Sequence, residues 1–324
     1  MISASIDLKE NQGTMVYQHI FGPVPSRRLG LSLGVDLMRH KTCSLDCVYC
    51  ECGKTTLLTL TPKEYVPLAS IKQELTSFLS ASPKLDFITF SGSGEPTLHS
   101  GIGEVASFIK TNFPQYKLAL LTNGTLLYLE DVRRRLLSID VVIVSVDAAT
   151  REAFRKVNRP HPKLTLEEIE AGLISFRKVF KNSLWAEVFL VPGCNTSQEE
   201  LSGIRKILQR FRPDKIQVNT LDRPGTEGWV APLDQKQLTW AASFLQASDP
   251  MPPPSGMFSL GGGDDPSGRL LAALRRRPLT LEDISRMLSI DASEARGCLD
   301  EMLREKTVKR VSMPRGTFYM ADTV

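Results

Sequence analysis

Long apolar runs are missing from this 324-residue sequence. Its longest apolar stretches, such as residues 118–121 and 141–144, have the length of strands and fall well short of the ~18 residues of a membrane-spanning helix. The first thirteen residues are polar and lack the apolar segment of a signal peptide. We therefore expect a cytoplasmic protein that makes no contact with a membrane.

A strong charge of either sign is also missing. The sequence has 40 Lys and Arg residues against 36 Asp and Glu residues, which gives a net charge of +4. This excess is too small to indicate nucleic-acid binding by itself. The apolar content of 42% is enough for a sizeable core, and the length predicts one large domain and one small domain.

Cysteines are few but unevenly spread. Four of the six fall within ten residues, at Cys43, Cys47, Cys50 and Cys52. In a long chain without a signal peptide, this clustering indicates metal binding rather than a disulfide framework. The spacing C-x3-C-x2-C puts three thiolates on one loop, where they can hold three corners of a 4Fe–4S cluster and leave the fourth iron open. A zinc site with Cys52 as fourth ligand is the alternative, although structural zinc usually takes separated pairs of ligands.

From residue 31 onward, short apolar runs alternate with amphipathic stretches. This alternation predicts an α/β fold with a parallel sheet, either doubly wound or curved into a partial barrel, with ligands at the carboxyl ends of the strands. Ser70, Thr165 and Ser197 each precede Gln or Glu by three residues, which predicts a capping box at each. The expected strands are 31–37, 85–90, 117–121, 141–146, 185–191 and 215–218, and the expected helices are 70–80, 101–112, 129–138, 165–180, 197–211 and 234–246.

The C-terminal part of the sequence has a different pattern. Residues 247–267 are rich in proline and glycine and are interpreted as a linker between a core domain, 1–246, and a small domain, 268–324. Three helical segments followed by a hairpin make the small domain resemble a winged helix-turn-helix domain. If it binds nucleic acid, the expected phosphate contacts are Arg275–Arg277, Lys309, Arg310 and Arg315. A protein-interaction or dimerisation module is the alternative.

Polar residues follow several of the predicted strands. The glycine-rich turn 91–97 follows the second strand, Asn123 follows the third, and Ser145 and Asp147 end the fourth. Glu187 lies inside the fifth strand, and Asn195 comes shortly after it. A carboxylate in a buried strand needs a partner, for which an arginine or a polar group of a ligand would serve.

The segment from Cys43 to Cys50, CSLDCVYC, resembles the signature of the radical S-adenosylmethionine (SAM) superfamily. Together with FGPVPSRRLG, FSGSGEPTLHS and QVNTLDRPGTE, it is similar to Fe–S oxidoreductases related to wyosine-type tRNA-modifying enzymes, over about residues 20–235. This resemblance implies a partial (β/α)6 TIM-like barrel with a 4Fe–4S cluster on Cys43, Cys47 and Cys50. It also implies SAM on the open iron and an external electron donor of flavodoxin or ferredoxin type.

The resemblance further implies a set of SAM-binding residues. Ser93 departs from the first glycine of the family's Gly-Gly-Glu motif, and Tyr49 fills its aromatic position beside the cluster. The ribose contacts would be Ser145 and Asp147. The full set is Tyr49, Gly92, Ser93, Gly94, Glu95, Pro96, Asn123, Ser145, Asp147, Glu187 and Asn195.

The function expected from this resemblance is reductive cleavage of SAM to a 5′-deoxyadenosyl radical, which then modifies a substrate. RNA such as tRNA is a candidate substrate, bound through residues 268–324. Two alternatives stay open: a cluster-containing DNA-binding redox sensor, and a radical SAM maturase that acts on a peptide or protein.

Overall fold

The computed structural model describes residues 17–26, 28–248 and 266–322. The linker expected at 247–267 lies almost entirely outside these ranges. The strands are β1 (Ile20–Ser26), β2 (Gly30–Val35), β3 (Thr42–Cys43), β4 (Leu57–Leu58), β5 (Phe87–Phe90), β6 (Lys117–Thr122), β7 (Val141–Ser145), β8 (Ser183–Phe189), β9 (Lys215–Asn219), β10 (Leu279–Thr280), β11 (Val308–Met313) and β12 (Gly316–Ala321). The helices are α1 (Leu68–Leu79), η1 (Pro96–Leu98), α2 (Ile102–Asn112), α3 (Glu130–Arg135), α4 (Arg151–Val157), α5 (Leu166–Val179), α6 (Gln198–Phe211), α7 (Gln235–Phe244), α8 (Pro266–Leu274), α9 (Leu281–Leu288) and α10 (Ala292–Arg304).

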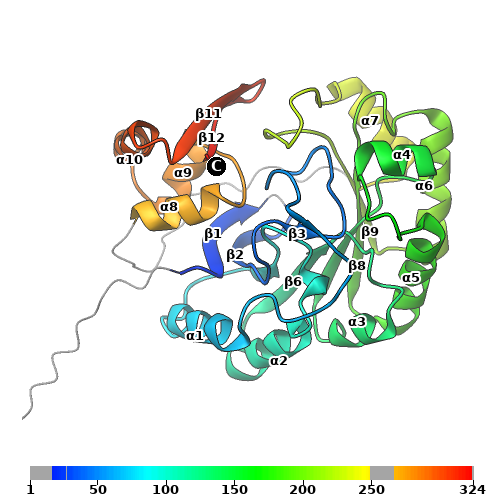
Figure 1. Cartoon of the computed structure of the whole chain (residues 1–324), viewed down its shortest axis with the longest axis horizontal. Coiled ribbons are helices and arrows are strands. Elements are labelled where there is room, and N and C mark those ends of the chain that lie inside the picture. The colour runs from blue at the N-terminus through cyan, green and yellow to red at the C-terminus, as the bar shows by residue number, and fades with distance from the viewer. Residues whose placement is uncertain (1–16, 27, 249–265, 323–324) are drawn as a thin grey trace, which may run out of the picture.

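The main sheet has seven strands in the order β1-β2-β5-β6-β7-β8-β9. The pair β1–β2 is antiparallel, and every later pair is parallel. The strands follow chain order without reversal, whereas a doubly wound sheet reverses at a switch point. The sheet curves, and its crossover helices lie on the outer side (Figure 1). The predicted α/β fold is confirmed, and all six expected strands are present.

Helix starts follow the local capping chemistry in two of the three predicted cases. Thr165 accepts a hydrogen bond from the Glu168 N–H and Ser197 accepts one from the Glu200 N–H, so both cap their helices, although neither forms the full capping box that was predicted. The cap predicted at Ser70 is wrong. Helix α1 begins at Leu68 after Pro67, which has a fixed φ and no N–H to satisfy, so the chain is helical before Ser70 is reached.

The C-terminal unit, residues 266–322, contains α8, β10, α9, α10, β11 and β12, with an antiparallel sheet in the order β10-β12-β11. The three helices and the hairpin agree with the prediction, whereas the short strand β10 was not predicted. Leu270, Ile284 and Leu299 form its core together with Phe21 and Val24 from β1. The unit therefore packs against β1, at the edge of the main sheet (Figure 1).

Within the described ranges, none of the helices combines the length and the apolar character that crossing a bilayer requires.

Candidate functional site

The cysteine loop follows β2 and begins in the short strand β3. The Asp46 N–H donates to the Asn158 carbonyl at 3.0 Å and the Val48 N–H to the Val157 carbonyl at 2.9 Å, so the loop is attached to the end of α4. On its other side, the Glu95 N–H donates to the Thr42 carbonyl at 3.0 Å. These backbone bonds hold the three cysteines of the motif next to the carboxyl ends of the parallel strands.

The glycine-rich turn after β5 touches this loop at two positions that only glycine can occupy. A Cβ on Gly94 would lie 2.0 Å from the Thr42 carbonyl oxygen. Gly92 has a φ of +150°, and a Cβ there would meet the Asp36 carboxylate at 2.3 Å. The resemblance to the family motif at 92–96 thus coincides with a close backbone approach to the strand that carries Cys43.

Each of the three motif cysteines accepts an N–H from a side chain elsewhere in the fold. The Lys41 ammonium lies 2.9 Å from Cys50 Sγ, the Asn158 amide 3.4 Å from Cys47 Sγ, and the Asn123 amide 3.6 Å from Cys43 Sγ. Such donors stabilise negative charge on sulfur. The three cysteines therefore have surroundings that suit thiolates, although Cys43 is buried and Cys47 and Cys50 are partly buried.

The acid–base properties of the thiols differ across the loop. Burial raises the pKa of Cys43 to about 11 and raises the pKa of Cys47 further. The pKa of Cys50 is lowered to about 5, first by a hydrogen bond from the Cys52 thiol and then, against the effect of burial, by the Lys41 ammonium. Burial opposes the charge of Lys41, but the neighbouring thiolates outweigh it and raise the Lys41 pKa. The cation and the sulfurs therefore stabilise each other.

Tyr49 is held by stacking and by a hydrogen bond. Its ring lies on the Phe189 ring with centroids 3.8 Å apart and an interplanar angle of 11°. Its hydroxyl donates to Asp147 at 2.5 Å, and the Asn158 amide donates to the same carboxylate at 2.8 Å. Burial raises the pKa of Asp147 to about 6. One chain of contacts thus links the end of β7 to the aromatic residue before Cys50 and, through Asn158, to Cys47.

Glu95 and Asn195 are buried, and the protein itself satisfies them. The Glu95 carboxylate accepts hydrogen bonds from Thr97, from the Thr122 hydroxyl at 2.6 Å and from the Asn123 N–H at 2.8 Å. Asn195 accepts from the Val191 N–H and donates to the Asp147 and Phe189 carbonyls. Both residues join neighbouring strand ends, which is a positioning role for the loops that carry them.

The remaining predicted residues lie at different places around the strand ends. Ser93 donates to Asp36 through its N–H and its hydroxyl, and Pro96 begins η1 as a buried residue. Asn123, Ser145 and Asp147 line a small cavity of about 40 Å³. Tyr49, Gly92 and Glu187 instead line a larger cavity, together with Cys50.

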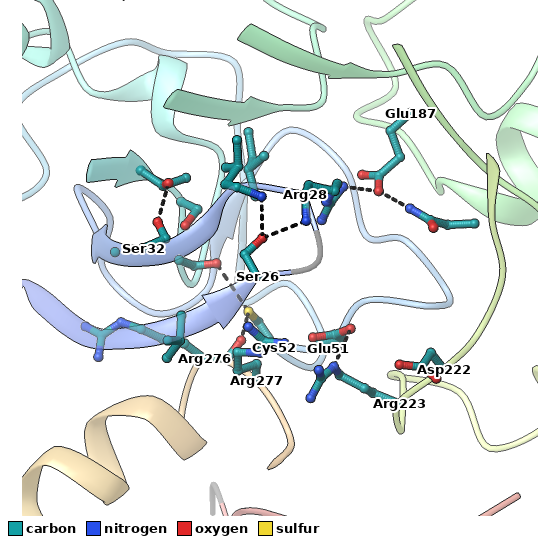
Figure 2. A pocket seen from close by; sticks show the side chains of 18 of the residues that line it. Ser26, Arg28, Ser32, Glu51, Cys52, Glu187, Asp222, Arg223, Arg276 and Arg277 are labelled. Carbon is teal, nitrogen blue, oxygen red and sulfur yellow. Dashed lines mark hydrogen bonds and ion pairs between the residues drawn. The ribbon is translucent and has the colours of Figure 1, made fainter. Parts of the chain in front are cut away.

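This larger cavity, of about 400 Å³, lies between the carboxyl ends of the strands and the C-terminal unit. Its volume falls in the ordinary range for a small-molecule site. Figure 2 shows its wall, with Arg28 directed at Glu187 on one side and with Cys52, Arg276 and Arg277 close together on the other. Glu187 has the arginine partner expected for a carboxylate in a buried strand. Arg28 donates a hydrogen bond to it, and so does the Asn219 amide.

Sequence patterns missed Lys41, Asn158 and Asp36. Lys41 precedes the first motif cysteine by two residues, and this proximity was the one local signal available. Asn158 is 111 residues away from Cys47, and Asp36 is 240 residues away from its partner Arg276. Contacts over such separations are set by the fold.

The donor set fits a 4Fe–4S cluster with one iron left to a ligand. The six cysteines are free thiols, and the three motif cysteines share one loop. The sulfur donors match the ligands of such clusters. Lys41 and Asn123 provide hydrogen bonds of the kind that tune cluster potential, and the large cavity begins at Cys50.

Comparison with known proteins agrees with this geometry. The model of the radical SAM superfamily matches residues 39–202. A UPF0026 protein of Helicobacter pylori is 32% identical over 301 residues, which cover 90% of this chain and 94% of that protein. A protein of Brachyspira hyodysenteriae named GTPase Obg is 37% identical over 233 residues, but these cover 71% of this chain and only 34% of that protein.

Comparison with solved structures finds a similar fold in a radical SAM enzyme. A radical SAM methyltransferase from Sphaerobacter thermophilus superposes with a TM-score of 0.51 at 16% identity, over 71% of this chain and 67% of that one. At this identity the likeness concerns the fold alone. The family match spans the cysteine loop and the strands that surround the large cavity. The chain therefore belongs to the radical SAM superfamily, a family of enzymes that work with a 4Fe–4S cluster and SAM.

Proposed function

We propose that this chain is an enzyme that reductively cleaves SAM at a 4Fe–4S cluster held by Cys43, Cys47 and Cys50. The observation that carries this proposal is the trio of sulfurs, each with its own N–H donor, of which Cys50 lines a cavity of about 400 Å³. When bound, the cluster and SAM supply a 5′-deoxyadenosyl radical, which is strong enough to take hydrogen from an unactivated carbon.

The residues of this chain would bind and orient the reactants. Tyr49, held by Phe189 and Asp147, forms a rigid wall next to Cys50. At Gly92 the absence of a side chain lets a ligand reach the protein backbone, and Glu187 places a carboxylate in the cavity. We propose that Glu95, Asn123, Ser145 and Asn195 serve SAM binding mainly by fixing the loops at the strand ends.

The proposal is tested by anaerobic reconstitution. The reduced protein, supplied with SAM and with flavodoxin or a chemical reductant, is expected to form 5′-deoxyadenosine, measured by liquid chromatography and mass spectrometry. Oxidised protein is the control. Failure to form 5′-deoxyadenosine with several reductants, in a protein that holds four irons, would overturn the proposal.

Lys41 provides a sharper readout of the cluster's surroundings. Lys41→Met removes a buried cation 2.9 Å from Cys50 Sγ, so the reduced and more negative cluster loses stabilisation. We expect the midpoint potential to fall by about 60–130 mV, the one-electron equivalent of losing one charge-assisted hydrogen bond. A redox titration followed by electron paramagnetic resonance measures it. The exposed Lys54→Met variant is the control, and an equal potential in the two variants would contradict the assignment.

We propose that the C-terminal unit acts as a winged helix that recognises the substrate. Its order of elements and its β11–β12 hairpin support this proposal. Arg275 and Arg310 are exposed and are available for phosphate contacts, whereas Arg276, Arg277 and Arg315 face the core domain. RNA is the substrate class we favour, and binding of tRNA to the full chain, measured by gel shift over a salt series, tests it.

A further inference from the structure

Four guanidinium groups line the large cavity, and they come from distant parts of the chain. Arg28 belongs to the turn after β1, Arg223 to the loop after β9, and Arg276 and Arg277 to the segment after α8. Figure 2 shows the last two beside Cys52, at the boundary between the core and the C-terminal unit. The carboxylates of the same wall are Glu51, Glu187 and Asp222.

Three of the four arginines are neutralised by carboxylates of the protein. Asp222, the remaining acid of the wall, forms an ion pair with Arg315 of the β11–β12 turn. The protein therefore supplies an anion to nearly every cation here. The pairs are Arg28 with Glu187, Arg276 with Asp36 at 2.8 Å, and Arg223 with Asp283 at 3.3 Å and Glu51 at 3.7 Å.

Arg277 is different from the other three. Across residues 17–26, 28–248 and 266–322, no oxygen accepts a hydrogen bond from its side chain, and its Nε is buried without a partner. Burial, followed by the nearby Arg223, lowers the pKa of Arg277 to about 10. A buried N–H group without an acceptor is costly, and the rest of this wall shows that the fold supplies acceptors elsewhere.

We propose that Arg277 binds a carboxylate or phosphate group of a molecule that occupies the large cavity. Its planar guanidinium matches both groups through paired N–H donors. The inference rests on the proposed function and deepens it, because the anion then belongs either to SAM, through its carboxylate, or to an anionic substrate. The C-terminal unit would thus contribute a binding residue to the site.

The test uses the full chain and inorganic phosphate as the probe, with acetate as the carboxylate counterpart. We expect phosphate to raise the melting temperature of the wild type in a saturable manner. Arg277→Gln is expected to weaken this response at least about tenfold in apparent Kd, the loss expected for one charged contact. Arg277→Lys should retain part of it. The matched control is Arg296→Gln, since Arg296 is exposed, belongs to the same C-terminal unit and lies outside the cavity wall.

The melting temperature of Arg277→Gln without phosphate shows whether the variant is folded. Arg277→Gln removes the side chain whose buried Nε has no acceptor, so its melting temperature without phosphate should equal or exceed that of the wild type. A wild type that ignores phosphate, or an Arg277→Gln variant that responds as the wild type does, would overturn the proposal.

Saturating SAM identifies the source of the anion. Loss of the phosphate response when SAM is added, with weaker SAM binding in Arg277→Gln, assigns the group to the SAM carboxylate. A phosphate response that persists with SAM bound assigns it to the substrate. Formation of 5′-deoxyadenosine is measured separately, so SAM cleavage without anion binding would refute the subsite alone, and anion binding without cleavage would refute the proposed function alone.

Discussion

A Cys47→Ala variant is expected to lose the cluster and, with it, the cleavage of SAM. Cys47 is one of three thiols on a single loop, and the Asn158 amide 3.4 Å away is positioned to stabilise its thiolate. Without it a second iron has no protein ligand, and cluster assembly fails. Iron content should fall to near zero, and formation of 5′-deoxyadenosine should fall at least about 10³-fold, as befits loss of the chemical step itself.

Variants of two cysteines outside the motif, Cys52 and Cys194, separate this outcome from the alternatives. Cys52 Sγ lies 3.2 Å from the Gly92 carbonyl and 3.0 Å from the Arg276 carbonyl, so it is directed toward the C-terminal unit. Cys52→Ser should therefore keep four irons and measurable cleavage, and Cys194→Ser serves as the remote control. Loss of metal in Cys52→Ser comparable to that in Cys47→Ala would contradict a three-cysteine cluster and favour four cysteine ligands.

The second large effect concerns the buried ion pair between Arg276 and Asp36. Arg276 Nε lies 2.8 Å from the Asp36 carboxylate, and the two side chains are only 11% and 2% exposed. Arg276→Ala leaves a buried carboxylate without its cation, which we expect to cost about 3 kcal/mol of unfolding free energy. Ser93 and the Met38 N–H still donate to Asp36, which places the estimate at the lower end for such pairs. Urea unfolding measures it.

An exposed ion pair provides the comparison. Arg151 and Glu167 are 3.2 Å apart with side chains 73% and 67% exposed, so Arg151→Ala should cost less than about 1 kcal/mol. Adding Asp36→Asn to Arg276→Ala should restore part of the lost stability, because the uncompensated charge is removed. Equal losses in Arg276→Ala and Arg151→Ala would show that the interface does not depend on this pair.

Local patterns in the sequence predicted six of the seven strands of the main sheet and missed β1, whose segment is rich in proline and glycine. The strand expected at 141–146 is β7, at Val141–Ser145, and the helix expected at 165–180 is α5, at Leu166–Val179. Apolar runs and side-chain caps act within a few residues, so the sequence reveals them directly. The closure of the sheet stayed open to pattern analysis, because strand order depends on contacts between segments far apart in the chain.

For the site, too, the sequence predicted local features but not the contacts between distant segments. The cysteine spacing identified the three sulfurs, and the isolated Glu187 correctly implied a partner, which is Arg28. Counting charges failed for Arg276 and Arg315, which were expected on a phosphate-binding surface and are paired with Asp36 and Asp222 instead. A charge count cannot tell which face of a small domain is covered by its neighbour.

Strand β1 belongs to two hydrophobic cores at once. Ile20 packs in the main core, while Phe21 and Val24 pack with Leu270 and Leu274 of the C-terminal unit. Cutting the chain after residue 248 would therefore strip an apolar face from an edge strand and leave a self-associating fragment. The two parts are not interchangeable modules. A shortened or recombined version of this protein must therefore keep β1 and the C-terminal unit in the same chain.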